Sequence, residues 1–175
     1  AKAGDIPITA SASSTGVDLR FLKAFTPPGL YDPIGKLSLG ASVSGTVGKP
    51  NVKGRLRLRG GGITVLALQQ RLRDIDLDVH GEGMHVELEK LVVHSGPGKL
   101  TTTATVDIAE DGTVRLGSDV VLDKFPLVRP GLPQMQIDSK IRATVASGSR
   151  GTAVDVSLRK TEVLVTGYSV RAPKA

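Results

Sequence analysis

The stretch that decides the fold is SGTVGKPNVKGRLRLRG, residues 44–60. Its second half alternates strictly, with small or aliphatic residues at the even positions 52–58 and basic residues at the odd positions 53–59. Successive side chains of a β-strand point to opposite faces, so this pattern predicts a strand with one apolar face and one charged face. Gly48, Pro50 and Asn51 favour a turn before it, which makes the whole stretch a predicted hairpin.

The same alternation recurs along most of the chain, from a short first strand at 6–12 to a last strand around 163–165. We count about ten such segments, and Asp111-Gly112 provides the clearest hairpin turn between two of them. Consecutive strands with short connections form an antiparallel meander. A phase slip at Glu89-Lys90 predicts a β-bulge, and the prolines of the stretch 126–133 predict a longer loop that interrupts the sheet. Residues 1–175 are therefore expected to form one all-β domain.

Two short helices are expected beside the strands. Thr15 is a candidate N-cap, and Val17, Phe21, Leu22 and Phe25 would share one face of a helix that ends before the following prolines. Residues 69–72 are expected to form one helical turn. The first helix either packs on the sheet as a small structural element or plugs one end of a hydrophobic trough.

Composition narrows the classes of function. The chain carries 23 Lys plus Arg against 17 Asp plus Glu, a net charge of +6, with the cations spread over many strands. This charge fits a solvated sheet exterior or attraction to an anionic surface. Three Phe, two Tyr and no Trp provide few stacking platforms, which disfavours nucleic-acid binding. Cysteine is absent, and no apolar run reaches the roughly 18 residues of a membrane span. We expect the chain to be a section of a longer protein.

The predicted apolar face is aliphatic and poor in aromatic residues, which fits either a tight aliphatic core or an open trough. Strands lie about 4.8 Å apart, so ten of them would give an apolar path of roughly 48 Å, which suits acyl chains. We assign to this groove the mid-strand residues Leu37, Leu39, Val43, Leu56, Leu58, Ile75, Leu77, Val79, Leu88, Leu100, Val106, Ile108, Ile137, Ile141 and Val156.

Metal-ligating residue types occur near one predicted turn. His80 and His85 could meet there, and Glu82 or Glu87 could join them. Exposed histidines at strand ends are the commoner case, so we predict no metal site.

Residues that could support catalysis are not arranged in a recognisable motif. Asp74, Asp76 and Asp78 alternate along one strand, but they lack the fixed loop and glycine of a calcium site and are expected to pair with arginines. The Gly60-Gly61-Gly62 run lacks the Lys-Ser/Thr and the helix of a phosphate loop. The sequence predicts neither an enzyme nor a cofactor.

Several segments together resemble the AsmA-like superfamily, and more closely the TamB carboxy-terminal domain family. The resemblance covers nearly the whole chain through the order and spacing of these segments: residues 14–19, residues 35–39 through 44–58, residues 72–77, residues 96–100 and residues 125–129.

The resemblance implies a long periplasmic protein anchored in the inner membrane of a diderm bacterium. Members of this family are built as a U-shaped gutter, the β-taco, with a hydrophobic inside. They are implicated in moving phospholipid toward the outer membrane, and in assembling outer-membrane or autotransporter proteins with a barrel partner of the TamA type. The family has no catalytic motif. The implied partners are phospholipid acyl chains, the barrel and neighbouring segments of the same chain, with no nucleic acid.

The sequence therefore leaves three hypotheses. The first is a passive conduit whose inner face solvates acyl chains while the headgroups stay at the rim. The second is an assembly module whose edge strands, at 6–12 and 163–165, receive strands of client proteins. The third is a structural β-solenoid with a filled core, which the irregular spacing of the repeats disfavours.

Overall fold

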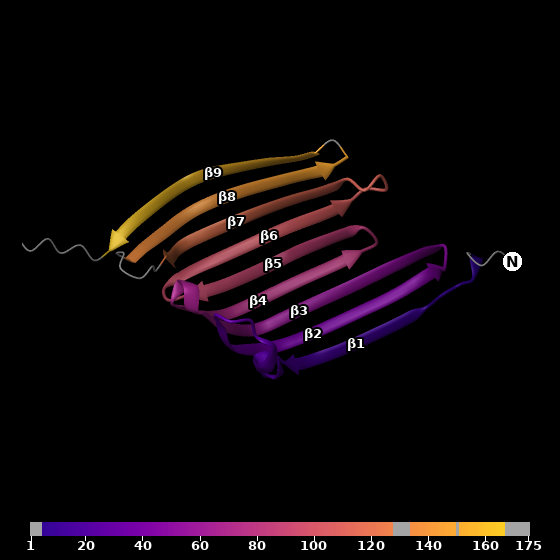
Figure 1. The fold of residues 1–175 in the computed structure, drawn as a ribbon, viewed down its shortest axis with the longest axis horizontal. Coiled ribbons are helices and arrows are strands. Elements are labelled where there is room, and N and C mark those ends of the chain that lie inside the picture. Colours follow the sequence, from indigo (N-terminus) through magenta and orange to yellow (C-terminus); the bar gives the residue numbers. More distant parts are fainter. Residues whose placement is uncertain (1–4, 128–133, 150, 167–175) are drawn as a thin grey trace, which may run out of the picture.

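The protein folds as a single nine-stranded antiparallel sheet (Figure 1). The computed structural model describes residues 5–127, 134–149 and 151–166. The strands are β1 (Ala10–Asp18), β2 (Leu30–Thr46), β3 (Lys49–Val65), β4 (Gln70–Glu82), β5 (His85–Ser95), β6 (Gly98–Ile108), β7 (Val114–Leu127), β8 (Gln134–Gly148) and β9 (Gly151–Thr166). Two 3₁₀ helices, η2 (Leu19–Phe25) and η3 (Leu66–Leu68), complete the fold.

The strands follow one another across the sheet in chain order, from β1 at one edge to β9 at the other. This confirms the predicted all-β class and the antiparallel meander, with nine strands in the described residues where the sequence predicts about ten. The sheet is open, and its strands bend along their length, most visibly in β7, β8 and β9 (Figure 1).

The sheet forms a single layer, so it has almost no core. Among the described residues, the only buried aliphatic or aromatic side chains are the neighbours Val92 and Val93, near the C-terminal end of β5. A second layer would bury the alternate residues of every strand. The open face that the sequence allowed is therefore the observed arrangement, and the tight aliphatic core is not.

The first hairpin is tighter than predicted. β2 and β3 extend almost to its tip, so Pro50 and Asn51 pair within the sheet and only Val47-Gly48 forms the turn. The left-handed conformation belongs to Gly45, with φ of 100°, and not to Gly48. A Cβ atom on Gly45 would lie 2.6 Å from the Lys49 carbonyl oxygen, so the close approach of the two strands requires glycine there.

Both expected helices differ from their predictions. Thr15 lies inside β1, and Asp18 is the N-cap of η2, where its carboxylate accepts a 2.9 Å hydrogen bond from the backbone N–H of Arg20. β1 begins at Ala10, later than predicted, and a bulge between Ser14 and Val17 carries it further along the chain. The second helical turn is η3, which ends at Gln69 in a left-handed conformation, so β4 starts where a helix was expected.

Two local predictions are confirmed. The register of β5 shifts between Leu88 and Leu91, as the phase slip at Glu89-Lys90 indicates. Residues 109–112 close the hairpin between β6 and β7, where the Gly112 N–H donates to the Ala109 carbonyl at 2.9 Å. Most of the expected loop at 126–133 lies outside the described residues, although Pro126 itself is part of β7.

Gly98, the first residue of β6, has no room for a side chain. A Cβ atom there would lie 2.6 Å from the Phe125 Cα of β7. We expect Gly98→Ala to destabilise the sheet by about 1–3 kcal/mol, because the backbone of β7 must move. The matched control is Gly54→Ala, where the nearest atom is 3.9 Å away and the expected change is below about 0.5 kcal/mol. Urea denaturation of both variants measures the difference, and equal midpoints would contradict it.

Candidate functional site

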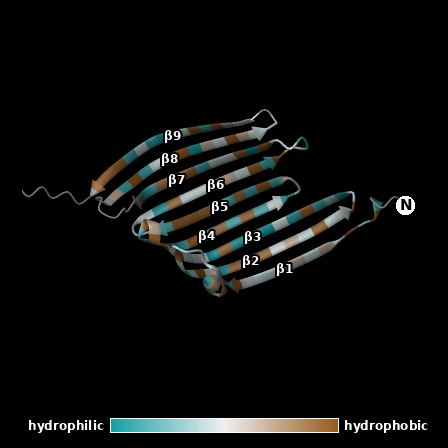
Figure 2. Ribbon diagram, in the orientation of Figure 1, coloured by the Kyte–Doolittle hydropathy of each residue, from teal (hydrophilic) through white to brown (hydrophobic). Residues whose placement is uncertain are grey.

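The candidate functional site is the apolar face of the sheet. Residues that pair across neighbouring antiparallel strands lie on the same face, so the register shows which side chains share it. Brown and teal residues alternate along the strands in Figure 2, as expected where the two faces differ in polarity. Followed strand by strand, the register brings all fifteen predicted groove residues onto one face.

Two apolar rows cross the sheet almost from edge to edge. The first row runs Leu37, Leu58, Leu77, Leu91, Thr102, Val120, Ile141 and Leu158. The second row runs Leu39, Leu56, Val79, Leu88, Ala104, Ser118, Ala143 and Val156.

The remaining predicted residues flank these rows on the same face. Val43 pairs with Val52, Leu100 with Val93 and Leu122, Val106 with Val86 and Leu116, Ile108 with Val114, Ile137 with Phe125 and Val163, and Ile75 with Gly61.

Sequence reasoning missed several members of this face. Leu91, Val120 and Leu158 complete the first row, although they were not assigned to the groove. Their alternation is visible in the sequence, but a bulge beside Leu91 hides its phase. Ser118 and Thr102 interrupt the rows with hydroxyl groups, so the face is not wholly aliphatic.

The apolar face is uncovered except at one end, where η2 lies against it. None of the fifteen predicted residues is buried: Leu39, Ile108 and Val156 are exposed, and the other twelve are half-buried. Leu39 is 48% exposed near one edge, and Val156 and Leu158 are 55% and 63% exposed on β9. Contiguous apolar surface of this extent on a protein marks an interaction site.

A small apolar pocket closes one end of this face, where η2 lies against the sheet. Its volume is about 270 Å³. Its lining comprises Leu19, Leu22, Thr26, Pro27, Pro33, Ile34, Leu58, Gly62, Ile63 and Ile75. η2 packs on the sheet at one end of the apolar face, a position that fits both roles considered for it, the small structural element and the plug.

The helical face predicted for η2 is partly wrong. Leu22 lines the pocket, but Phe21 is 55% exposed. A 3₁₀ helix has three residues per turn, so Leu19 and Leu22 stack on one side and Phe21 is rotated away from it. The periodicity of an α-helix, used in the prediction, gives a different face.

The opposite face of the sheet carries ion pairs centred on Asp78. Its Oδ1 lies 2.9 Å from Arg57 Nε and 3.7 Å from Arg55 Nη2, and its Oδ2 pairs with Arg59. Hydrogen bonding from Arg59, and then from Arg57, lowers the pKa of the Asp78 carboxyl below its ordinary value. The arginine partners expected for the aspartate row are present at Asp78.

The two histidines considered for metal binding lie in the same charged surface. His85 Nδ1 is 2.6 Å from Asp107 Oδ1, and this hydrogen bond raises the pKa of His85. His80 Nε2 is 3.5 Å from Glu87 Oε2 and its Nδ1 is 3.1 Å from Glu89 Oε1. In the described part of the chain, no three His, Asp or Glu side chains form a group that could hold a metal ion.

The comparisons with known proteins give no information on function, so the functional argument uses the geometry of the sheet. No family model, no curated protein and no solved structure matches the chain. Within residues 5–127, 134–149 and 151–166, no helix has the length and apolarity needed to cross a membrane. The functional argument therefore starts from the uncovered apolar face.

The Asp78 network should stabilise the sheet in a pH-dependent way. We expect Asp78→Asn to cost roughly 1 kcal/mol at neutral pH, because three arginines lose their shared carboxylate. The pKa of Asp78 is lower in the folded than in the unfolded state, so this stabilisation is present above pH ~4 and is lost as the pH falls through the folded pKa. Denaturation of both proteins between neutral and acidic pH measures the difference.

The matched control is Asp119→Asn, because Asp119 pairs with Arg142 alone and both side chains are more than half exposed. We expect a change below about 0.5 kcal/mol for this exposed pair. A cost at Asp78 that is no larger than the cost at Asp119, or that does not shrink in acid, would contradict the role given to the network.

Proposed function

We propose that this protein is a non-enzymatic conduit for phospholipid acyl chains. The observation that carries the proposal is the apolar face, whose rows cross strands β2–β9 and which, apart from η2 at one end, is covered by no other part of the described chain. Exposed apolar surface costs about 25 cal/mol per Å² relative to burial, so a bound apolar partner is strongly favoured.

The dimensions and chemistry of the face favour acyl chains as that partner. Seven steps of about 4.8 Å between the eight strands β2–β9 give a path of roughly 34 Å along the rows. The hydrocarbon core of a bilayer is about 30 Å thick, so the chains of one leaflet reach about 15 Å and can lie along this path. The rows consist mostly of aliphatic side chains, which contact hydrocarbon without requiring hydrogen bonds.

The setting of this conduit follows from the family resemblance. We propose a periplasmic location, with the whole protein anchored in the inner membrane and phospholipid passing toward the outer membrane. Neighbouring segments of the same chain would extend the sheet beyond β1 and β9, and a barrel of the TamA type would receive its end. The net charge of +6 favours contact with anionic headgroups at the rim.

A charged residue in the first apolar row tests the conduit. Leu77 is half-buried in the middle of that row, between Leu58 and Leu91. Water reaches the open face, so Leu77→Asp should leave the sheet folded while removing hydrocarbon contact. We expect a photoreactive side chain at Leu56 to crosslink phospholipid in the parent protein and to lose most of that crosslinking in the Leu77→Asp variant.

The control for this experiment is Val121→Asp. Val121 is 38% exposed and lies on the opposite face, where it pairs with Thr101 and Lys140. Crosslinking at Leu56 should be unchanged in this variant. Unfolding of the Leu77→Asp protein would indicate an ordinary core, and unchanged crosslinking in a stable Leu77→Asp protein would exclude acyl chains from this face.

A second candidate function is strand addition at the sheet edges. β9 is an edge strand of 16 residues, and its apolar residues Val154, Val156 and Leu158 are all more than half exposed. Long, exposed, apolar edges receive strands from other chains. This observation supports an assembly module for outer-membrane proteins, and the same edge could serve a conduit by joining neighbouring segments.

Self-association should distinguish edge pairing from contact between faces. We expect the isolated chain to dimerise at high concentration and Val156→Lys to reduce dimerisation, because a lysine on an edge strand opposes strand addition. The control is Val86→Lys in central β5, which lies on the same face but far from either edge. Light scattering should show a dimer for Val86→Lys, whereas loss of the dimer in both variants would indicate association through the faces.

A further inference from the structure

We propose that the end of the sheet covered by η2 binds single amphiphiles with one acyl tail in an apolar pocket and an anionic headgroup against Arg71. We call this place the η2 port, formed by the apolar pocket described above and by a neighbouring charged pocket. The proposal deepens the conduit function and rests on it, since it names the headgroup class and the end of the face where the headgroup lies.

The apolar half of the port is built from η2 and from three strands of the sheet. Leu19 and Leu22 reach it from η2, while Ile34, Leu58 and Ile75 reach it from three successive strands. Leu58 and Ile75 also belong to the apolar face, so a tail in the pocket continues directly onto that face. Glycine at position 62 keeps the pocket floor open, because a Cβ atom there would lie 2.9 Å from the Ile34 side chain.

The charged half of the port is next to the apolar half, because Pro33 and Ile34 line both pockets. Its volume is about 330 Å³, and its remaining lining residues are Arg20, Lys23, Asp32 and Arg71. An apolar pocket and a cationic pocket that share one wall match the two ends of an amphiphile, whereas a free anion would need only the second.

The charge balance of the port favours one anionic group. Lys23 Nζ is 3.1 Å from Asp32 Oδ1, and Arg20 Nε is 3.9 Å from Asp18 Oδ2. Arg71 is exposed and has no carboxylate within ion-pair distance in the described part of the chain. Three cations therefore face two carboxylates, which leaves one positive charge for the single negative charge of a phosphodiester.

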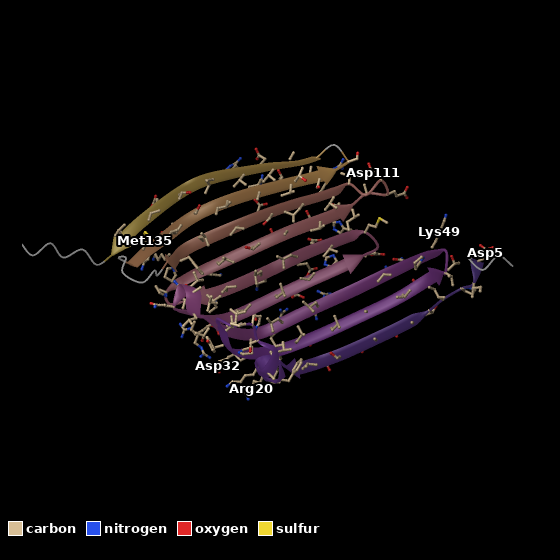
Figure 3. All side chains as sticks on the ribbon, viewed as in Figure 1. Asp5, Arg20, Asp32, Lys49, Asp111 and Met135 are labelled. Atoms are coloured by element: carbon tan, nitrogen blue, oxygen red, sulfur yellow. The ribbon has the colours of Figure 1, made fainter. Side chains whose placement is uncertain are left out.

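The port lies at one end of the strands only. Figure 3 shows Arg20 and Asp32 together at the η2 end, with Asp111 and Lys49 at the opposite end of the sheet. A headgroup held beside Arg71 would leave the tail pointing along the apolar face, so the port gives a bound lipid one orientation.

Monomeric lysophosphatidylglycerol is a suitable probe, because it combines one tail with one phosphodiester. The neutral comparison is a monoacylglycerol with the same tail. We expect a photoreactive side chain at Ile63, in the port lining, to crosslink both probes in the full chain. Arg71→Glu should weaken the binding of lysophosphatidylglycerol five- to tenfold and that of the monoacylglycerol less than twofold, since only the first carries charge.

Two control variants distinguish the contribution of the headgroup charge to binding from that of the acyl tail. Arg115→Glu reverses an exposed cation beside Asp107, near the Asp111 end, and should change neither affinity more than twofold. Leu22→Gln removes apolar lining from a helix outside the sheet, so it should weaken both probes without unfolding the strands. An excess of inorganic phosphate should not displace lysophosphatidylglycerol, whereas displacement would reduce the port to a phosphate site and overturn the proposal.

The same experiment separates failure of the port from failure of the conduit. Crosslinking at Leu56 in mid-face without crosslinking at Ile63, or equal effects of Arg71→Glu and Arg115→Glu, would overturn the port and leave the conduit standing. The absence of crosslinking at both Leu56 and Ile63 would overturn both proposals. Crosslinking at both positions with selective loss in Arg71→Glu is the expected result.

Discussion

Cross-strand register is the constraint on which the rest of this structure depends. In a single layer, each strand is held only by its neighbours, through backbone hydrogen bonds and pairs of side chains on each face. A slip of one residue would move every side chain of a strand to the other face. Bulges occur along several strands: Gly60, Asp74, Lys124 and Lys160 take left-handed conformations at or beside register shifts. Beyond the shift at Lys124, for example, Phe125 pairs with Ile137, so apolar residues again share a face.

The charged face contributes ion pairs to stability, and the apolar face is the one proposed to bind a ligand. On the charged face, the ion pairs of Asp78 with three arginines of β3 tie neighbouring strands together. Such pairs stabilise the sheet without a second layer, because their solvated partners need no apolar cover. The apolar face is therefore free to hold a ligand, and a hydrocarbon partner would supply the burial that a packed core supplies in other folds.

Binding and edge pairing can operate together in this architecture. The apolar rows run perpendicular to the strands, so adding a strand at β1 or β9 lengthens the path for a tail. The proposed η2 port would make the two ends of the strands different, because at the η2 end an apolar pocket and a cationic pocket share Pro33 and Ile34. In the proposed function, the open sheet would give an acyl chain a path and the η2 end would give it an orientation.

The sequence by itself determined the properties that depend on residues close together in the chain. Alternation at 52–59 predicts that β3 has one apolar and one charged face. The phase slip at Glu89-Lys90 predicts the bulge in β5, and Asp111-Gly112 predicts the turn between β6 and β7. Alternation within strands also placed the fifteen residues assigned to the groove on one face, and the register agrees with that placement. Local pattern was less reliable at the ends of elements, where the turn at Val47-Gly48 and the 3₁₀ geometry of η2 differ from expectation.

Only the tertiary structure decided whether the apolar face is covered. A strand that packs against a second sheet and a strand that faces open space have the same alternation, because the period reports which side is apolar and not what lies beyond it. The residues of the proposed η2 port could not be predicted from the sequence either, because local pattern does not show which distant segments come together. Leu22, Ile34, Ile75 and Arg71 are far apart in the chain, and they meet because η2 folds back over the ends of the strands.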